Sequence, residues 1–110
     1  MSKTVDITII CKEPPVGRCH IYVNMAIVAI EHYKNVLFHV KPNGLRGENE
    51  PQAPAMMVNG CPLEPEDNIM VSADELLRAL RGGGALLLPG HQEPKAQLEK
   101  AVDSYVPPGR

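Results

Sequence analysis

Residues 5–40 decide the fold, and their sequence is VDITIICKEPPVGRCHIYVNMAIVAIEHYKNVLFHV. At the start of this stretch, Val5, Ile7 and Ile9 alternate with their neighbours, which is the period of a strand with one face on a core. Residues 36–40 at its end repeat the alternation. The connection between these two strands is long enough for a helix, which favours a parallel pair joined by a right-handed crossover.

The residues between the two strands predict a loop followed by a helix. Residues 12–18 contain two prolines and a glycine, which neither regular structure absorbs. From Cys19 to about Tyr33, apolar residues recur at spacings of three and four, including Ile21, Met25 and Val28. The apolar face is broad, as expected for a helix packed on a sheet.

The next part of the chain predicts a hairpin and a second helix. Residues 41–52 form a long polar connection that is either a loop or a loop with one short helical turn. Residues 54–58 predict a third strand, Asn59-Gly60 a tight turn, and the residues from Cys61 a short edge strand. Ser72 followed by Glu75 predicts a capping box, and the three glycines at 82–84 predict the end of that helix.

The last 26 residues predict an extension to this unit. Residues 93–105 form a final helix with Leu98, Val102 and Tyr105 on one side. We therefore expect a domain at residues 1–84 and an extension at residues 85–110 that packs either on the domain or on a second subunit. The second arrangement makes the chain a homodimer.

Composition excludes several classes of function. The chain has 110 residues and a formal net charge of -2, which gives no electrostatic basis for binding nucleic acid or an anionic membrane. No apolar run approaches the ~20 residues of a membrane span. The first residues lack the features of a signal peptide, so we expect a cytoplasmic protein. In that compartment, three cysteines indicate thiols, a redox pair or metal ligands rather than a disulfide framework.

The order of elements and three local motifs resemble the thioredoxin-like superfamily, in particular its small redox-disulfide and glutaredoxin-like proteins. The motifs are a cysteine at the start of the first helix, Pro54 opening the third strand in PAMMVNG, and the later Ser72-x-x-Glu75. The resemblance covers roughly residues 5–80. It implies an α/β fold with the order β-α-β, then β-β-α, a mixed four-stranded sheet, and a cis peptide bond at Pro54 beside the active-site loop.

The active-site motif departs from the family pattern. Redox members carry Cys-x-x-Cys at the turn from strand to helix, whereas residues 16–19 here are VGRC. Val16 occupies the position of the usual first cysteine, and Cys19 that of the second. Cys11 lies eight residues before Cys19, so standard dithiol chemistry through this motif is not expected.

Cys19 is the leading candidate for chemistry. A helix N-terminus stabilises thiolate over thiol, and Arg18 adds a nearby positive charge. His20 could add another charge or carry a proton near neutral pH. The alternative is a buried cysteine that fills space at the start of the helix, since free cysteine is among the most buried residue types.

Cys11 is the natural partner of Cys19, because the intervening prolines and glycine can turn the chain back toward the strand end. A disulfide between them requires Cα atoms within about 7 Å. Cys61 follows the hairpin turn, which lies at the opposite end of such a sheet, and we expect no role for it. The cysteine and histidine spacings match none of the common zinc patterns.

These observations lead to one hypothesis and two alternatives. The first is a thiol–disulfide oxidoreductase without a cofactor or metal, in which Cys19 reacts with a protein thiol or disulfide, Cys11 resolves the adduct, and Pro54, Arg18 and His20 bind the partner. The first alternative is a non-catalytic thioredoxin-like module that binds a protein or dimerises. The weaker alternative is a metal or iron–sulfur carrier.

Overall fold

Four strands form one mixed, open sheet in a computed structural model that describes residues 4–12, 17–65 and 70–104. The strands are β1 (Val5–Cys11), β2 (Val36–Pro42), β3 (Ala55–Val58) and β4 (Cys61–Pro62). Their order is β2-β1-β3-β4. β1 pairs with β2 in parallel, while β3 pairs antiparallel with both β1 and β4. The expected α/β class, the parallel first pair and the mixed four-stranded sheet are therefore confirmed.

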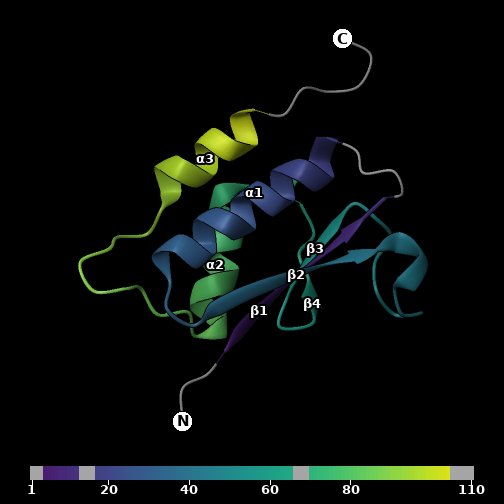
Figure 1. Cartoon of the computed structure of the whole chain (residues 1–110), viewed down its shortest axis with the longest axis horizontal. Coiled ribbons are helices and arrows are strands. Elements are labelled where there is room, and N and C mark those ends of the chain that lie inside the picture. The colour runs from purple at the N-terminus through teal and green to yellow at the C-terminus, as the bar shows by residue number, and fades with distance from the viewer. Residues whose placement is uncertain (1–3, 13–16, 66–69, 105–110) are drawn as a thin grey trace.

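Three helices and one short turn complete the described chain. They are α1 (Gly17–His32), the 3₁₀ turn η1 (Asn43–Leu45), α2 (Ala73–Gly83) and α3 (Lys95–Asp103). Figure 1 shows α1 lying along the sheet, with α2 behind it and α3 stacked on the outer side of α1. No helix in the described ranges is both long and apolar enough to cross a bilayer.

Alternation along β1 divides the apolar side chains between the two faces of the sheet. Val5, Ile7 and Ile9 belong to one buried cluster with the apolar faces of all three helices. Ile10 faces the other way and packs with Ala55 and Met57 of β3. Ile10 is fully buried, so β1 is covered on both faces, as its unbroken apolar end at residues 9–11 requires.

Two predicted local signals are present in the structure. Ser72 caps α2: its hydroxyl accepts a hydrogen bond from the Glu75 amide, and the Glu75 carboxylate accepts one from the Ser72 amide. Asn59 and Gly60 have φ of 51° and 80°, the left-handed conformation that a two-residue hairpin turn needs. The turn joins β3 to the very short edge strand β4.

The element boundaries differ from the predicted ones by a few residues. α1 starts at Gly17 rather than Cys19, which places Cys19 inside the first turn of the helix. Gly82 and Gly83 remain helical, and α2 ends at Gly84, whose φ is 91°. The final helix is Lys95–Asp103 rather than 93–105, because Pro94 at its start has non-helical dihedral angles. Tyr105 lies outside the described residues.

The C-terminal segment joins the same core as the rest of the chain. Leu98 of α3 is fully buried in the main cluster, and α3 packs against α1 and α2. Before α3, the Leu88 amide donates to the His32 carbonyl, and the Lys34 amide donates to the Leu86 carbonyl. The division into a domain at 1–84 and an extension at 85–110 stays a prediction.

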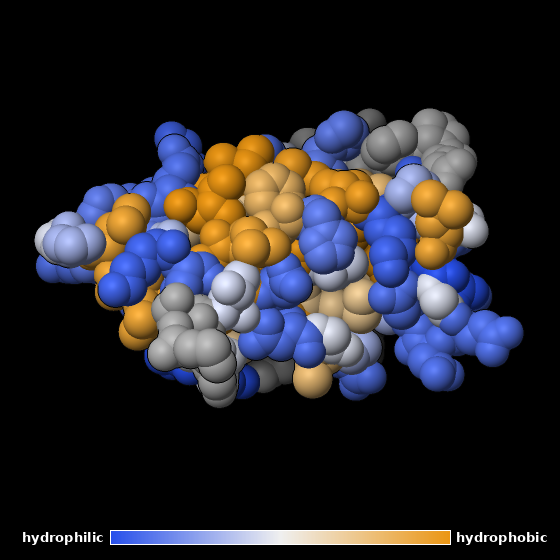
Figure 2. Space-filling view, turned by 60° about the horizontal axis from the view of Figure 1, so that its bottom comes forward, coloured by the Kyte–Doolittle hydropathy of each residue, from blue (hydrophilic) through white to orange (hydrophobic). Residues whose placement is uncertain are grey.

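One face of the molecule is markedly apolar. In Figure 2, hydrophobic side chains gather in the upper half of the view, over α1 and β2. Several large apolar side chains of these two elements are exposed, among them Ile27, Ile30 and Val40.

Candidate functional site

Cys19 lies in the first turn of α1 and points into the core. Cys19 is 1% exposed and belongs to a buried cluster that also contains Cys11 and Tyr22. Its Sγ accepts a hydrogen bond from the Lys12 backbone amide, with a nitrogen-to-sulfur distance of 3.4 Å. Cys19 is therefore both a helix-start cysteine and a space-filling one, the two roles between which the sequence leaves the choice open.

Cys11 ends β1 and is 7% exposed. The pKa of its thiol is raised to about 12, first by burial and then by a side-chain hydrogen bond to Cys19 and the charge on Cys19. Cys11 is thus the member of the pair that keeps its proton, and its thiol donates to Cys19 Sγ. The end of β1 and the start of α1 bring these two cysteines into contact. The sequence alone gave only the expectation that they could pair.

A disulfide between Cys11 and Cys19 would replace an existing contact between their side chains. Both thiols are free, and their sulfurs are in hydrogen-bond contact. Closing a disulfide requires the sulfurs to approach to about 2.05 Å. The connecting residues 13–16, including Val16, lie outside the described part of the chain.

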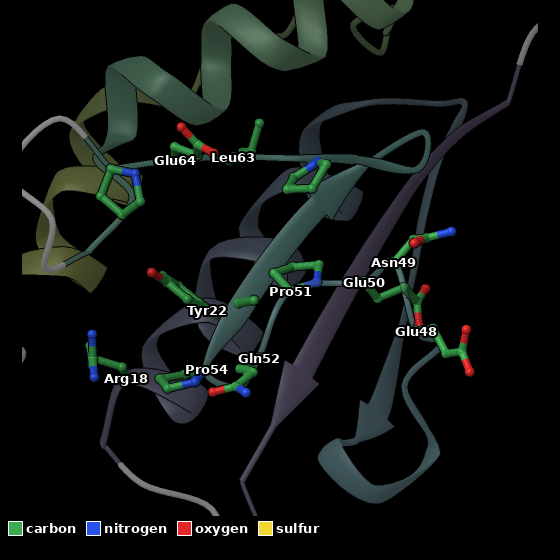
Figure 3. A pocket seen from close by; sticks show the side chains of 13 residues that line it. Arg18, Tyr22, Glu48, Asn49, Glu50, Pro51, Gln52, Pro54, Leu63 and Glu64 are labelled. Carbon is green, nitrogen blue, oxygen red and sulfur yellow. The ribbon is translucent and has the colours of Figure 1, made fainter.

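A groove opens beside this pair. It has a volume of about 390 Å³ and lies between the start of α1, the segment before β3 and the segment after β4. Figure 3 shows Arg18 and Pro54 at one end and Leu63 and Glu64 at the opposite end. The peptide bond between Ala53 and Pro54 is cis, which confirms the conformation that the resemblance implies.

The groove wall contains neighbours of the two cysteines but not their side chains. Arg18 precedes Cys19, and Ala55 in the groove wall pairs with Ile10, which precedes Cys11. Neither cysteine lines the groove. A partner bound there would contact chain neighbours of the two cysteines and neither sulfur.

Arg18 and His20, the two charged candidates near Cys19, have different environments. Arg18 is half-buried and lines the groove. His20 is exposed, as expected for a residue about 100° around the helix from a buried neighbour. The structure therefore brings Cys11, Cys19, Arg18 and Pro54 to one end of the sheet and leaves His20 at the surface.

Sequence reasoning missed two groups in the groove wall. Tyr22 is almost fully buried, and its hydroxyl accepts a hydrogen bond from the Val71 amide at 3.1 Å. Glu50 accepts from Lys41 Nζ at 2.8 Å, and this hydrogen bond, followed by one from the Gly47 amide, lowers the pKa of Glu50. The helical spacing of Tyr22 with Met25 and Ala26 gave a signal for burial, but nothing local marks either residue as part of a groove.

Cys61 is exposed on β4, away from the other two cysteines. It pairs with Val58, which in turn pairs with Ile7, four residues along β1 from Cys11. Four residues of strand span roughly 13 Å. Cys61 is thus a suitable internal control for the thiol chemistry of the pair.

The remaining histidines have local contacts. His39 Nε2 lies 3.1 Å from Thr8 Oγ1, and the rings of His32 and His91 meet edge to face with centroids 5.2 Å apart. Across residues 4–12, 17–65 and 70–104, no three His, Cys, Asp or Glu side chains lie together as metal ligands.

Comparisons with models of known protein families, with curated proteins and with solved structures yield no match for this chain.

Proposed function

We propose that this protein is a thiol–disulfide redox protein that uses Cys11 and Cys19 as its dithiol. The observation that carries the proposal is the hydrogen-bonded contact between the two free thiols at the end of β1 and the start of α1. Two cysteines eight residues apart are buried against each other there, while Cys61 is exposed elsewhere. Packing alone does not require a second cysteine at that contact.

We also propose that the fold is thioredoxin-like. The order β-α-β followed by a hairpin and a helix supports this, as does the sheet order β2-β1-β3-β4. The cis peptide bond before β3, next to the groove and the cysteines, has the position that the resemblance implies. The dithiol differs from the family pattern, since its first cysteine comes from the end of β1 rather than from the helix-start motif.

The chemistry balances without a cofactor. Cys19, whose Sγ accepts a hydrogen bond from the Lys12 amide, is the nucleophile after its proton has left to solvent. It attacks one sulfur of a partner disulfide, forming a mixed disulfide and releasing one partner thiolate, which takes up a proton. Cys11 then loses its proton and attacks Cys19 Sγ, which releases the second partner thiolate to be protonated. The two protein thiols are oxidised to a disulfide, and the partner disulfide is reduced to two thiols.

A second function is favoured by a separate observation, namely the depth of the pair. Cys19 is almost completely buried, so a bulky disulfide reaches it only after local opening of the neighbouring chain. The groove at Arg18 and Pro54 needs no such opening. If the thiols are unreactive, we propose a non-catalytic module that binds a protein partner through this groove.

Thiol counting tests the redox function. The purified protein is equilibrated in glutathione buffers from fully reducing to oxidising, quenched with an alkylating reagent, and analysed by peptide mapping. We expect a reversible Cys11–Cys19 disulfide, with Cys61 alkylated or glutathionylated independently. The Cys61→Ser variant should form the Cys11–Cys19 disulfide over the same range of glutathione buffers as the wild type, because Cys61 lies at the other end of the sheet.

The single-cysteine variants distinguish the dithiol from isolated thiols. Cys11→Ser and Cys19→Ser should each abolish the reversible two-electron transition and the reduction of a model protein disulfide. Three free thiols throughout the titration, or an unchanged transition in Cys19→Ser, would contradict the redox function and leave the binding module as the proposal to pursue.

A further inference from the structure

β2 forms one edge of the sheet and is its most exposed strand of full length. It has seven residues, and within the described chain no strand pairs with it on the side away from β1. An unpaired edge offers a row of backbone donors and acceptors to another extended chain. The opposite edge, β4, has only two residues and offers little for pairing.

The first five residues of the β2 edge lack the charges that usually protect such strands. Residues 36–40 are VLFHV and contain no Asp, Glu, Lys or Arg. The one lysine of β2, Lys41, has both carboxylate oxygens of Glu50 within 3.0 Å of its Nζ. Natural edge strands are commonly guarded by charged side chains, especially lysine, by proline or by bulges. In β2 such residues stand only at its end, as Lys41 and Pro42, so residues 36–40 form the unguarded part of the edge.

Apolar side chains continue from this strand onto α1. Phe38 and Val40 share a face of β2, since they pair with Ile7 and Ile9, whose side chains face the helices. Val23, Ile27 and Ile30 follow at helical spacing on α1, which packs against β2. We call these five side chains the edge patch. Figure 2 shows hydrophobic side chains gathered on one face of the molecule, with hydrophilic ones between some of them.

The edge patch is exposed to an extent that burial in this chain does not explain. Ile27, Ile30 and Val40 are 39%, 38% and 46% exposed, and Leu37 on the other face of β2 is 47% exposed. Contiguous apolar surface of this kind marks an interaction site. An occupant must therefore supply an extended backbone for β2 together with apolar side chains for both of its faces.

We propose that the occupant is a second copy of this chain, whose β2 pairs antiparallel with the first β2 about a two-fold axis. The strand itself meets both requirements, because it is extended and apolar on alternate residues. A two-fold contact is self-complementary, so the same exposed surface is buried twice. The pairing joins the two sheets into one sheet of eight strands. It also places the edge-patch residues of the two α1 helices side by side.

The register is fixed by side-chain chemistry. Centring the pair on Phe38 sets Phe38 against its own copy and Val40 against Val36 of the second copy. Leu37 then meets His39 on the other face, and Lys41 meets the uncharged Asn35. No two like charges face each other, which cross-strand pairing requires. The contact needs neither the cysteines nor the groove at Pro54.

Sedimentation of the full chain from micromolar to millimolar concentration, under reducing conditions, tests the proposal. We expect a monomer–dimer equilibrium in the wild type. Val40→Lys should weaken dimerisation by roughly tenfold or more, because it twice places a charge on the shared apolar face, opposite Val36 of the other copy. Ala96→Lys is the matched control: it adds the same charge at an exposed position of α3, which does not border β2, and should dimerise like the wild type.

Hydrogen exchange gives the second measurement. The amides of residues 36–40 should become more protected as concentration rises, with no comparable change in β3. A wild-type chain that stays monomeric at millimolar concentration would overturn the proposal. Dimerisation that survives Val40→Lys unchanged, or protection confined to α3, would overturn it too. Because the tests run under reducing conditions, they stand apart from those of the redox function.

Discussion

At the residue scale, the central feature is the difference between two cysteines that touch. Cys19 accepts a hydrogen bond from a backbone amide, whereas Cys11 is the thiol that donates. Burial removes water from both, and the charge that forms first on Cys19 opposes ionisation of Cys11. Cys11 is therefore the sulfur that holds its proton before any partner is bound.

The raised pKa of Cys11 predicts a pH dependence of stability. The folded chain holds this proton up to about pH 12, against an ordinary value of 9.0 in the unfolded chain. The stabilisation is fully present below pH 9 and is lost between pH 9 and about 12. Cys11→Ser keeps a hydroxyl donor toward Cys19 but does not ionise in this range. As the pH rises from 9 to about 12, we expect the free energy of unfolding of Cys11→Ser to fall less steeply than that of the wild type.

Urea denaturation across this pH range, with reductant present, measures the difference. Cys61→Ser is the control, since it removes an exposed thiol that lies away from the pair. If the free energy of unfolding falls equally steeply with pH in the wild type and in Cys11→Ser, the raised pKa of Cys11 is contradicted.

At the scale of the element, α2 shows how one local signal fixes a boundary. Its capping box satisfies amides at the helix start, and its Leu76, Leu77 and Leu80 are buried in the main cluster. The left-handed Gly84 then ends it, and the Gly84 amide donates to the carbonyls of Arg81 and Leu80. Both ends of this helix are therefore determined by residues within three positions of them.

We predict that Ser72→Ala lowers the free energy of unfolding by about 1 kcal/mol, because it removes the acceptor for the Glu75 amide. Ser72→Asp should be close to neutral, since a carboxylate accepts the same bond and suits the helix N-terminus. Chemical denaturation of the three proteins at neutral pH measures this. An equal loss in both variants would show that the hydroxyl is needed for something other than capping.

At the scale of the whole molecule, α3 is part of the same core as the sheet. Leu98 is fully buried among residues of α1, α2 and β1. The ion pair between Arg81 Nε and Glu93 Oε2, at 2.7 Å, adds a contact between the end of α2 and the segment before α3. This pair is exposed, so we attribute the docking of α3 to apolar burial.

We predict that Leu98→Ala destabilises the whole chain by about 2–5 kcal/mol, the usual cost of a cavity at a fully buried leucine. The exposed neighbour Gln97→Ala should change stability by no more than about 0.5 kcal/mol. Thermal unfolding followed in both far- and near-ultraviolet circular dichroism measures the two variants. Separate transitions in Leu98→Ala would instead support an extension that folds independently of residues 1–84.

Residues close together along the chain were enough to predict which elements form and where α2 begins. Alternation predicted β1 and the first part of β2, helical spacing predicted α1, and the turn and cap residues predicted the hairpin and the start of α2. These signals succeed because each depends on residues a few positions apart, whose period or dihedral angles are set locally. The parallel pairing of β1 and β2 followed from the length of their connection.

Tertiary structure decided what the local residues could not. The hydrogen bond between Cys11 and Cys19, the groove between Arg18, Pro54 and Leu63, and the docking of Leu98 each join segments that no local pattern relates. The ion pair between Lys41 and Glu50 is likewise a contact that no local pattern predicts. Burial and pairing across the sheet set these contacts, because desolvation and hydrogen bonding depend on what lies nearby in space rather than along the chain.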